Sequence, residues 1–402
     1  MLPWSDWMGI GNYPMSDETA YPPNTFTAAV WRNGCQFFGQ IVPAPLTQSL
    51  SCLLIAIFIL EQCFPVESAN GLVPDGRTMT AFGAFSAPLI LHGEWWRFFV
   101  GPLLHGGPFH LIEDVVGLMG VGLALEPLVG RVWFGALLAI GAIAGAVCSF
   151  VWLPAGSQTV GSSGAVMSAL AANFVCSFRF QDIRQRRFLQ KNSFLYLVPM
   201  LIGTFNGFHG AGLAVDISSH VGGTAAGVAL GCILLLIWPS QSPKPRFDFV
   251  ASMVVAGYVT ACAMGFVVMV SHYNFYAEYY AGIISRRDFP QSGEEKLIRS
   301  RYYVEHYPLD PTAHLFLGEF YLQKKIYPFA EGEFRIASAL AASPIINPNE
   351  RNLIAGYLAL ALWLQGRRSE ASPVAKPLCY GKVDDTESVK LQYYLLTHGL
   401  CS

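Results

Sequence analysis

The 402-residue sequence has few charged residues. Asp, Glu, Lys and Arg make up 13% of the chain, and hydrophobic residues make up 53%, whereas charged residues account for about 25% of a typical soluble domain. This deficit argues against a soluble globular protein and indicates a membrane protein. The net charge is −2, so an excess of basic residues is also absent, and we expect no nucleic acid partner.

Several motifs are missing as well. The nine cysteines include no CxxC pair, so those in or beside apolar runs are expected to be small buried side chains. No HExxH occurs, which disfavours an intramembrane metalloprotease built on His105, His110 and Glu113. We expect no metal and no cofactor. Residues 1–45 lack a basic segment followed by an apolar run, so we expect them to form a cytoplasmic N-terminal segment before a retained first span.

Seven apolar segments approach the 20 or so residues that cross a bilayer. They are 46–64, 109–128, 132–153, 160–178, 194–208, 217–238 and 247–271. Glycines recur every fourth residue in the third segment (Gly141 and Gly145) and in the sixth (Gly223, Gly227 and Gly231), and such spacing lets helices pack closely. The sequence therefore predicts an all-α polytopic membrane bundle in the lipid bilayer, with a six-span core over 46–240 and a seventh span over 247–271.

Basic residues predict the orientation of these spans. Arg131, the segment 179–191, and Lys244 with Arg246 follow the second, fourth and sixth spans, and connections rich in Lys and Arg are usually cytoplasmic. The N-terminus is then inside, and everything after about residue 272 is outside. We expect Trp95, Trp96 and Arg97, in the first external connection, to lie at the level of the lipid headgroups. The expected location is a bacterial inner (cell) membrane.

Residues 273–402 have a different pattern, which resembles a tetratricopeptide repeat. The matching residues are Leu317, Gly318, Tyr321, Ala330, Phe334 and Ala337, with a weaker echo at Leu358, Ala359, Gly366 and Ala371. The echo requires an inserted loop over 343–352. We expect an extracytoplasmic helical domain with a protein partner, the alternative being a helical hairpin domain without one. Outside the cell, Cys379 and Cys401 are the plausible disulfide pair, although both could also be free thiols.

Polar residues lie at one depth near the outer ends of three spans. Ser162 and Ser163 stand between Gly161 and Gly164, and His220 lies in the first turn of the sixth span. A histidine within the membrane is costly unless it has a partner, so it is a candidate functional residue. A helix-packing serine and a satisfied core histidine are the alternatives. A neutral histidine can activate a serine hydroxyl as a nucleophile.

The small-residue faces of the fourth and sixth spans could bring Ser163 and His220 together. Gly164, Ser168 and Ala172 continue the face of Ser163, and the glycines of the sixth segment continue the face of His220. The backbone N–H of Ser163, at a helix start, and the side chain of His110 could stabilise an oxyanion.

In these features the chain resembles the rhomboid family of intramembrane serine proteases. The matching pieces, in family order, are Trp96 and Arg97, His105 and His110, Glu126 and Gly130, the GxSG box 161–164, and His220 to Gly223. The resemblance implies that Ser163 is the nucleophile, His220 the base and His110 an oxyanion contributor. It also implies a membrane-protein substrate that is cleaved in or near a transmembrane segment.

Two positions depart from the family pattern. Asp114 stands where the family usually has asparagine, and Met167 stands where it often has a tyrosine that stacks on the catalytic ring. A thioether can also pack on an imidazole. Asp114, if protonated, could donate to the oxyanion as the amide does. The alternatives are a catalytically inactive rhomboid-like protein that binds membrane clients, and a transporter, for which the two repeated halves with broken helices are missing.

Overall fold

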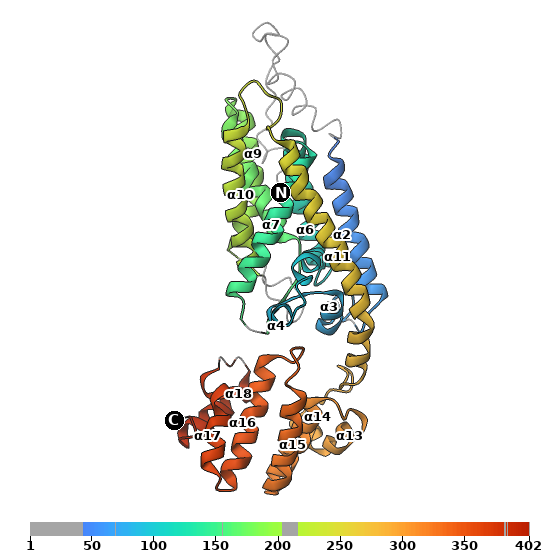
Figure 1. Ribbon diagram of the computed structural model, residues 1–402, viewed down its shortest axis with the longest axis vertical. Helices are drawn as coiled ribbons and strands as arrows, with labels where there is room; N and C mark the ends of the chain where they lie inside the picture. The colour runs from blue at the N-terminus through green and yellow to red at the C-terminus, as the bar shows by residue number, and fades with distance from the viewer. Residues whose placement is uncertain are drawn as a thin grey trace, which may run out of the picture. The chain divides into compact units, whose positions relative to one another are not determined.

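The computed structural model describes residues 43–401 apart from 69, 155, 203–215, 382 and 384. The expected cytoplasmic segment, 1–45, therefore lies outside the described residues as far as residue 42. The described chain is almost entirely helical (Figure 1). Its two short strands, β1 (Phe85–Ser86) and β2 (Gln158–Thr159), form an antiparallel pair.

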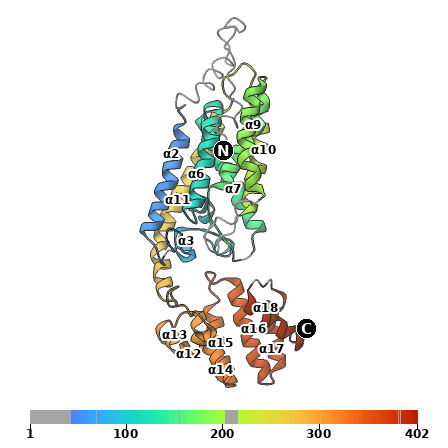
Figure 2. The same ribbon diagram turned by 180° about the vertical axis from the view of Figure 1, so that it is seen from behind.

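Seven long helices occupy the described residues up to 281. They are α2 (Pro45–Cys63), α6 (Pro108–Val129), α7 (Arg131–Trp152), α8 (Ser163–Cys176), α9 (Ile183–Leu201), α10 (Ile217–Ile237) and α11 (Asp248–Ala281). In Figure 1 and Figure 2, α2 and α11 lie on one side of the bundle and α9 and α10 on the other. Helix α8 is central, because it contacts α6, α7, α9 and α10. The predicted all-α polytopic bundle is confirmed.

Four of these helices, α2, α7, α10 and α11, are long and apolar enough to cross a membrane. The others overlap predicted spans but differ in character. Helix α6 contains three carboxylates, α8 has only 14 residues, and α9 begins in a basic segment. The four apolar helices indicate a membrane protein.

The fifth predicted segment, 194–208, begins too late. Helix α9 starts at Ile183, because the Asp182 carboxylate caps it by accepting a hydrogen bond from the backbone N–H of Arg184 (2.8 Å). Much of the basic segment predicted as a connection is therefore the first half of a helix. Residues 203–208, at the other end of this prediction, lie outside the described residues.

The seventh predicted segment, 247–271, ends too early. Helix α11 continues ten residues further, to Ala281. Tyr276 and Tyr280 on this extension are buried and pack against Ala81 of α3 (Gly76–Phe82). This packing against a distant segment stabilises the helix beyond the end of the apolar run. The first residues of the predicted 273–402 domain therefore belong to α11.

The connection between α2 and α6 enters the protein interior. It contains α3, α4 (Ala87–Leu91), α5 (Arg97–Val100) and the 3₁₀ helix η2 (Gly101–Leu103). The exposed fractions of Trp96 and Arg97 are 1% and 0%, whereas that of Trp95 is 44%. The side chains of Trp96 and Arg97 therefore pack inside the protein rather than against lipid, and their depth at the level of the headgroups stays a prediction.

Arg97 is buried because its charge is fully partnered. Its guanidinium donates to the Glu94 carboxylate (2.7 Å), to the carbonyls of Thr80 (2.8 Å) and Ala84 (2.9 Å), and to the Tyr276 hydroxyl (3.0 Å). It connects the loop beside β1 with helix α11. A buried charge is stable only with such partners.

The C-terminal part consists of shorter helices. They are α12 (Gly293–Ile298), α13 (Ser300–His306), α14 (Pro311–Gln323), α15 (Tyr327–Leu340), α16 (Pro348–Leu364), α17 (Arg368–Tyr380) and α18 (Thr386–Thr397). In the α14/α15 hairpin, Gly318 leaves room for Phe334, which a Cβ would approach to 2.4 Å. The predicted insertion 343–352 is shorter than expected, since Asn347 caps α16 and the helix begins at Pro348.

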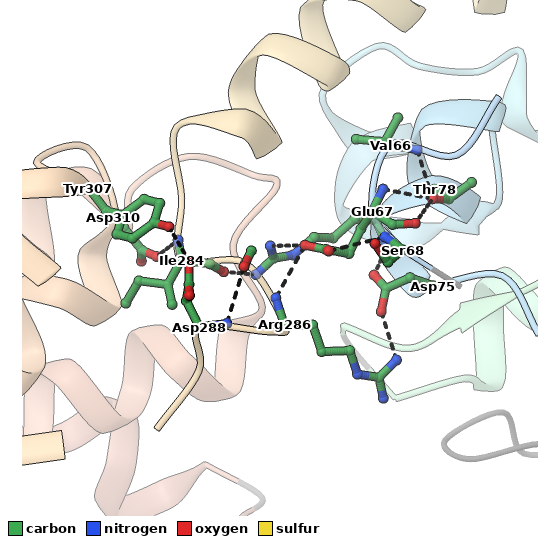
Figure 3. A network of polar contacts seen from close by, with 12 residues as sticks. Val66, Glu67, Ser68, Asp75, Thr78, Ile284, Arg286, Asp288, Tyr307 and Asp310 are labelled. Carbon is green, nitrogen blue, oxygen red and sulfur yellow. Dashed lines mark hydrogen bonds and ion pairs between the residues drawn. The ribbon is translucent and has the colours of Figure 1, made fainter. Parts of the chain in front are cut away.

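Polar contacts connect the loop after α2 with the segment after α11 (Figure 3). Arg286 donates from Nη1 to Asp75 Oδ2 (2.9 Å) and from its backbone to Glu67 Oε2 (3.3 Å). Arg77 donates to Glu67 (3.0 Å) and to the Ile284 carbonyl (2.9 Å). The bonds of Arg286 and the bond to the Ile284 carbonyl join residues that are 207 to 219 positions apart in sequence.

Candidate active site

Ser163 is the first residue of α8 and is buried, with 6% of its surface exposed. The sequence predicted a helix over 160–178, but the helix begins only at Ser163. Gly161 has φ 119°, a non-helical conformation that glycine adopts more readily than other residues, and it prevents the helix from starting earlier. Ser162 is the N-cap residue. The chain turn thus places the Ser163 side chain and N–H at the start of a helix, where backbone N–H groups are free to bind negative charge.

His220 lies in the first turn of α10 and is 3% exposed. Its Nδ1 lies 2.9 Å from the carbonyl oxygen of Met200, near the end of α9. A carbonyl oxygen only accepts hydrogen bonds, so Nδ1 carries the proton and the Nε2 lone pair remains available as a base.

Asp216 holds the start of α10. Its Oδ1 accepts from the backbone N–H of Ser219 (3.0 Å), and its Oδ2 accepts from the Ser149 hydroxyl of α7 (2.5 Å). The cap fixes the first turn of α10 against α7, and His220 is in that turn.

Helices α8 and α10 pack closely along their glycine faces, as the spacing predicts. A Cβ at Gly223 would lie 2.1 Å from the carbonyl oxygen of Gly164, and a Cβ at Gly227 would lie equally close to that of Ser168. Gly231 continues the row beside Ala172. The close approach begins one residue after Ser163 and three after His220, so both residues lie at the same end of this contact. Among the hydrogen bonds of the described residues, none joins Ser163 directly to His220. Such bonds often tighten only when substrate is bound.

His110 and Asp114 lie one turn apart on α6, next to the segment before Ser163. A Cβ at Gly161 would be 2.6 Å from His110 Nε2 and 3.5 Å from Asp114 Oδ2. Asp114 is fully buried, and its Oδ2 accepts from the Ser162 hydroxyl (2.8 Å) and lies 3.2 Å from Nε2 of the buried His105. The structure therefore brings together the serine segment, His110 and Asp114, with His105 beyond them.

A small pocket opens beside Ser163. It is lined by residues of five stretches of the chain: Phe85, Gly101, Pro102, Ala142, Ala146, Thr159, Val160, Gly161, Ser163, Gly164, Asp216 and Ser219. Sequence reasoning missed Asp216 and Ser219. The aspartate before the apolar run ISSHV is a helix N-cap signal that could have indicated the first.

Two of the predicted supporting residues, Glu126 and Met167, are buried, Glu126 at the end of α6 that is remote from His110 and Asp114. Glu126, 2% exposed, accepts from the backbone N–H groups of Leu46 (3.0 Å) and Thr47 (2.8 Å) and from the Thr47 hydroxyl (2.7 Å), so it caps α2. Met167 is fully buried one turn after Ser163. In the described residues, no group of three or more His, Cys, Asp or Glu side chains could hold a metal ion.

The fold and the site together define a polytopic helical membrane protein that places a serine at a buried helix start near a histidine of the adjacent helix. A rhomboid domain model matches residues 92–237. The chain is 30% identical to RHOMBOID-like protein 5 of Arabidopsis thaliana over 251 residues, covering 62% of this chain and 72% of that protein. The chain belongs to the rhomboid family.

Bacterial relatives include two proteins named as proteases. Rhomboid protease GluP of Bacillus subtilis is 30% identical over 200 residues, half of this chain and 35% of GluP. Rhomboid protease AarA of Providencia stuartii is 27% identical over 215 residues, 48% of this chain and 73% of AarA. This chain therefore covers about a third of the length of GluP.

Proposed function

We propose that this protein is a serine endopeptidase that hydrolyses a peptide bond in or near a transmembrane segment of a membrane protein. The observation that carries the proposal is the glycine contact of α8 with α10, with Ser163 and His220 at the same end of it. The family relationship supports the same reaction.

The mechanism uses a serine and histidine pair. Ser163 Oγ attacks the carbonyl carbon of the scissile bond, and Nε2 of His220 takes the hydroxyl proton. The tautomer that the Met200 carbonyl selects supports this role. His220 then returns the proton to the leaving amine, and water, activated by the same imidazole, hydrolyses the acyl-enzyme.

The oxyanion receives donors from two directions. The backbone N–H of Ser163 lies at the start of α8, and His110 lies against Gly161 on the other side of the same segment. Preorganised donors of this kind stabilise the charge of the tetrahedral intermediate. The donor role predicted for Asp114 from the sequence stays a prediction at this point.

A serine-directed fluorophosphonate probe tests the proposal. Wild-type protein in detergent should be labelled at Ser163, whereas Ser163→Ala and His220→Ala should lose both labelling and cleavage of a model membrane substrate. The double variant should be no worse than either single variant, because nucleophile and base act as a unit. If folded wild-type protein is neither labelled nor able to cleave, the alternative of an inactive, client-binding rhomboid-like protein replaces the proposal.

We also propose that the N-terminus is cytoplasmic and that residues after α11 are extracytoplasmic, where their helices contact a protein partner. The disulfide between Cys379 and Cys401 supports this orientation, since disulfides persist in oxidising compartments. Protease added to intact cells should remove the C-terminal helices. Their complete protection in cells with an accessible surface control would contradict this topology.

A further inference from the structure

The hydroxyl of Ser162 does not act as an ordinary helix cap. A serine at the N-cap position usually accepts a hydrogen bond from a backbone N–H of the first turn. The Ser162 side chain makes no such bond to α8. It points instead to α6 and donates to Asp114 Oδ2 at 2.8 Å. The residue next to the nucleophile is thus bonded across the site to another helix.

Asp114 is placed to accept rather than to donate. It is fully buried, and its Oδ2 accepts from the Ser162 hydroxyl and lies 3.2 Å from Nε2 of His105, which donates to it in the Nε2–H tautomer. His105 is in turn connected to α2, because its backbone N–H donates to Glu61 Oε1 (3.2 Å). These polar contacts run from α2 through α6 to the start of α8.

The residue types at the two positions fit each other chemically. An asparagine at position 114 would offer both an N–H donor and an oxygen acceptor. A carboxylate offers only acceptors, so a buried carboxylate requires donors around it. The variable position of the GxSG box is a serine in this chain, and that serine supplies one of them.

We propose that Ser162 and Asp114 form a positioning pair that sets the orientation of the nucleophile. The bond from Ser162 to α6 holds the first turn of α8 so that Ser163 Oγ and the Ser163 N–H face the pocket beside His110. The inference rests on the proposed function, since it assigns a positioning role around Ser163. In it, Asp114 acts through Ser162 and does not itself donate to the oxyanion.

The test is a mutant cycle measured with purified protein and a model membrane substrate. Ser162→Ala should lower kcat about tenfold, the effect expected for one hydrogen bond to a charged group, with KM unchanged because substrate contacts remain. Asp114→Ala should lower kcat at least as much. The double variant should be no slower than Asp114→Ala alone, because both changes remove the same bond. Ser252→Ala, which removes a hydroxyl bonded to the Asp248 carbonyl on α11, is the matched control and should keep wild-type kinetics.

Two further measurements guard against misfolding. Ser162→Ala should unfold at a lower temperature than Ser252→Ala, because the buried Asp114 carboxylate loses a donor. Turnover is therefore compared at a temperature well below both unfolding midpoints, so that a loss of kcat reports on positioning. Asp114→Asn keeps an acceptor for Ser162 and should stay within about threefold of wild type, even if Asp114→Ala does not fold.

The results separate three possibilities. If wild-type protein is labelled at Ser163 and Ser162→Ala is labelled and turns over at the wild-type rate, the positioning pair is refuted while the proposed function stands. If Ser162→Ala and Asp114→Ala multiply in their effects, Asp114 acts independently, as the oxyanion donor predicted from the sequence. If folded wild-type protein is unlabelled and inactive, the proposed function fails, and the positioning pair fails with it.

Discussion

Replacing Gly223 with alanine would place a Cβ 2.1 Å from the carbonyl oxygen of Gly164. Ordinary C···O contacts in proteins begin at about 3.3 Å. The obstacle is backbone rather than a flexible side chain, so α8 and α10 would have to separate by roughly 1 Å at the end where Ser163 and His220 lie.

The magnitude follows from two separate effects. A misplacement of about 1 Å between reacting groups costs about 10²-fold in rate. Overpacking a tight contact costs about 1–3 kcal/mol, but alanine in a helix interior regains about 1 kcal/mol relative to glycine. Gly223→Ala should therefore lose about 10²-fold in kcat while the free energy of unfolding falls by about 2 kcal/mol or less.

The assay is cleavage of a model membrane substrate, with thermal unfolding in the same detergent. Gly257→Ala is the matched control, because a Cβ there meets no atom within 4 Å, and it should cleave like wild type. Gly227→Ala creates the same 2.1 Å clash one turn further along, against Ser168, and should lose less activity at a similar cost in stability. A Gly223→Ala variant that cleaves at the wild-type rate would refute the idea that this contact sets the distance between Ser163 and His220.

Three other predictions concern the rest of the molecule. Arg97→Met, which leaves a carboxylate without its buried partner, should destabilise the fold by about 3 kcal/mol and be visible as a lower unfolding midpoint. Cys401→Ser removes the disulfide to Cys379, 22 positions away, and should lower the free energy of unfolding by about 3 kcal/mol. A wild-type unfolding midpoint that does not change on reduction would contradict this. Burial would lower the pKa of His314, but its hydrogen bonds to Glu333 and to a backbone carbonyl raise it above its usual 6.5. Protonated His314 therefore stabilises the fold below pH 6.5, and this stabilisation is lost as the pH rises through the folded-state pKa. The difference in midpoint between wild type and His314→Gln should shrink over that range, and a constant difference would contradict it.

The sequence predicted the helices that depend on local pattern. Apolar runs of span length gave the approximate positions of the long helices, because membrane helices satisfy their backbone internally and need only length and apolar side chains. The glycine spacing predicted the contact of α8 with α10, since residues four apart lie on one helix face. The order of the polar motifs was sufficient to indicate the family. Boundaries were predicted less well where a single cap decides them, as at Asp182 before α9.

Only the tertiary structure decided which distant residues meet. Arg97 and Tyr276 are 179 positions apart, and their contact places Arg97 in the interior rather than at the lipid surface. The bond from Ser162 to Asp114 spans 48 positions, and neither residue type reveals its partner by spacing. Helical periodicity reports which face a side chain occupies, but a buried polar group is stabilised by whichever partner the packed fold brings within hydrogen-bond distance. The sequence therefore predicted the candidate catalytic pair, Ser163 and His220, whereas the contacts that orient these residues depend on how the helices pack.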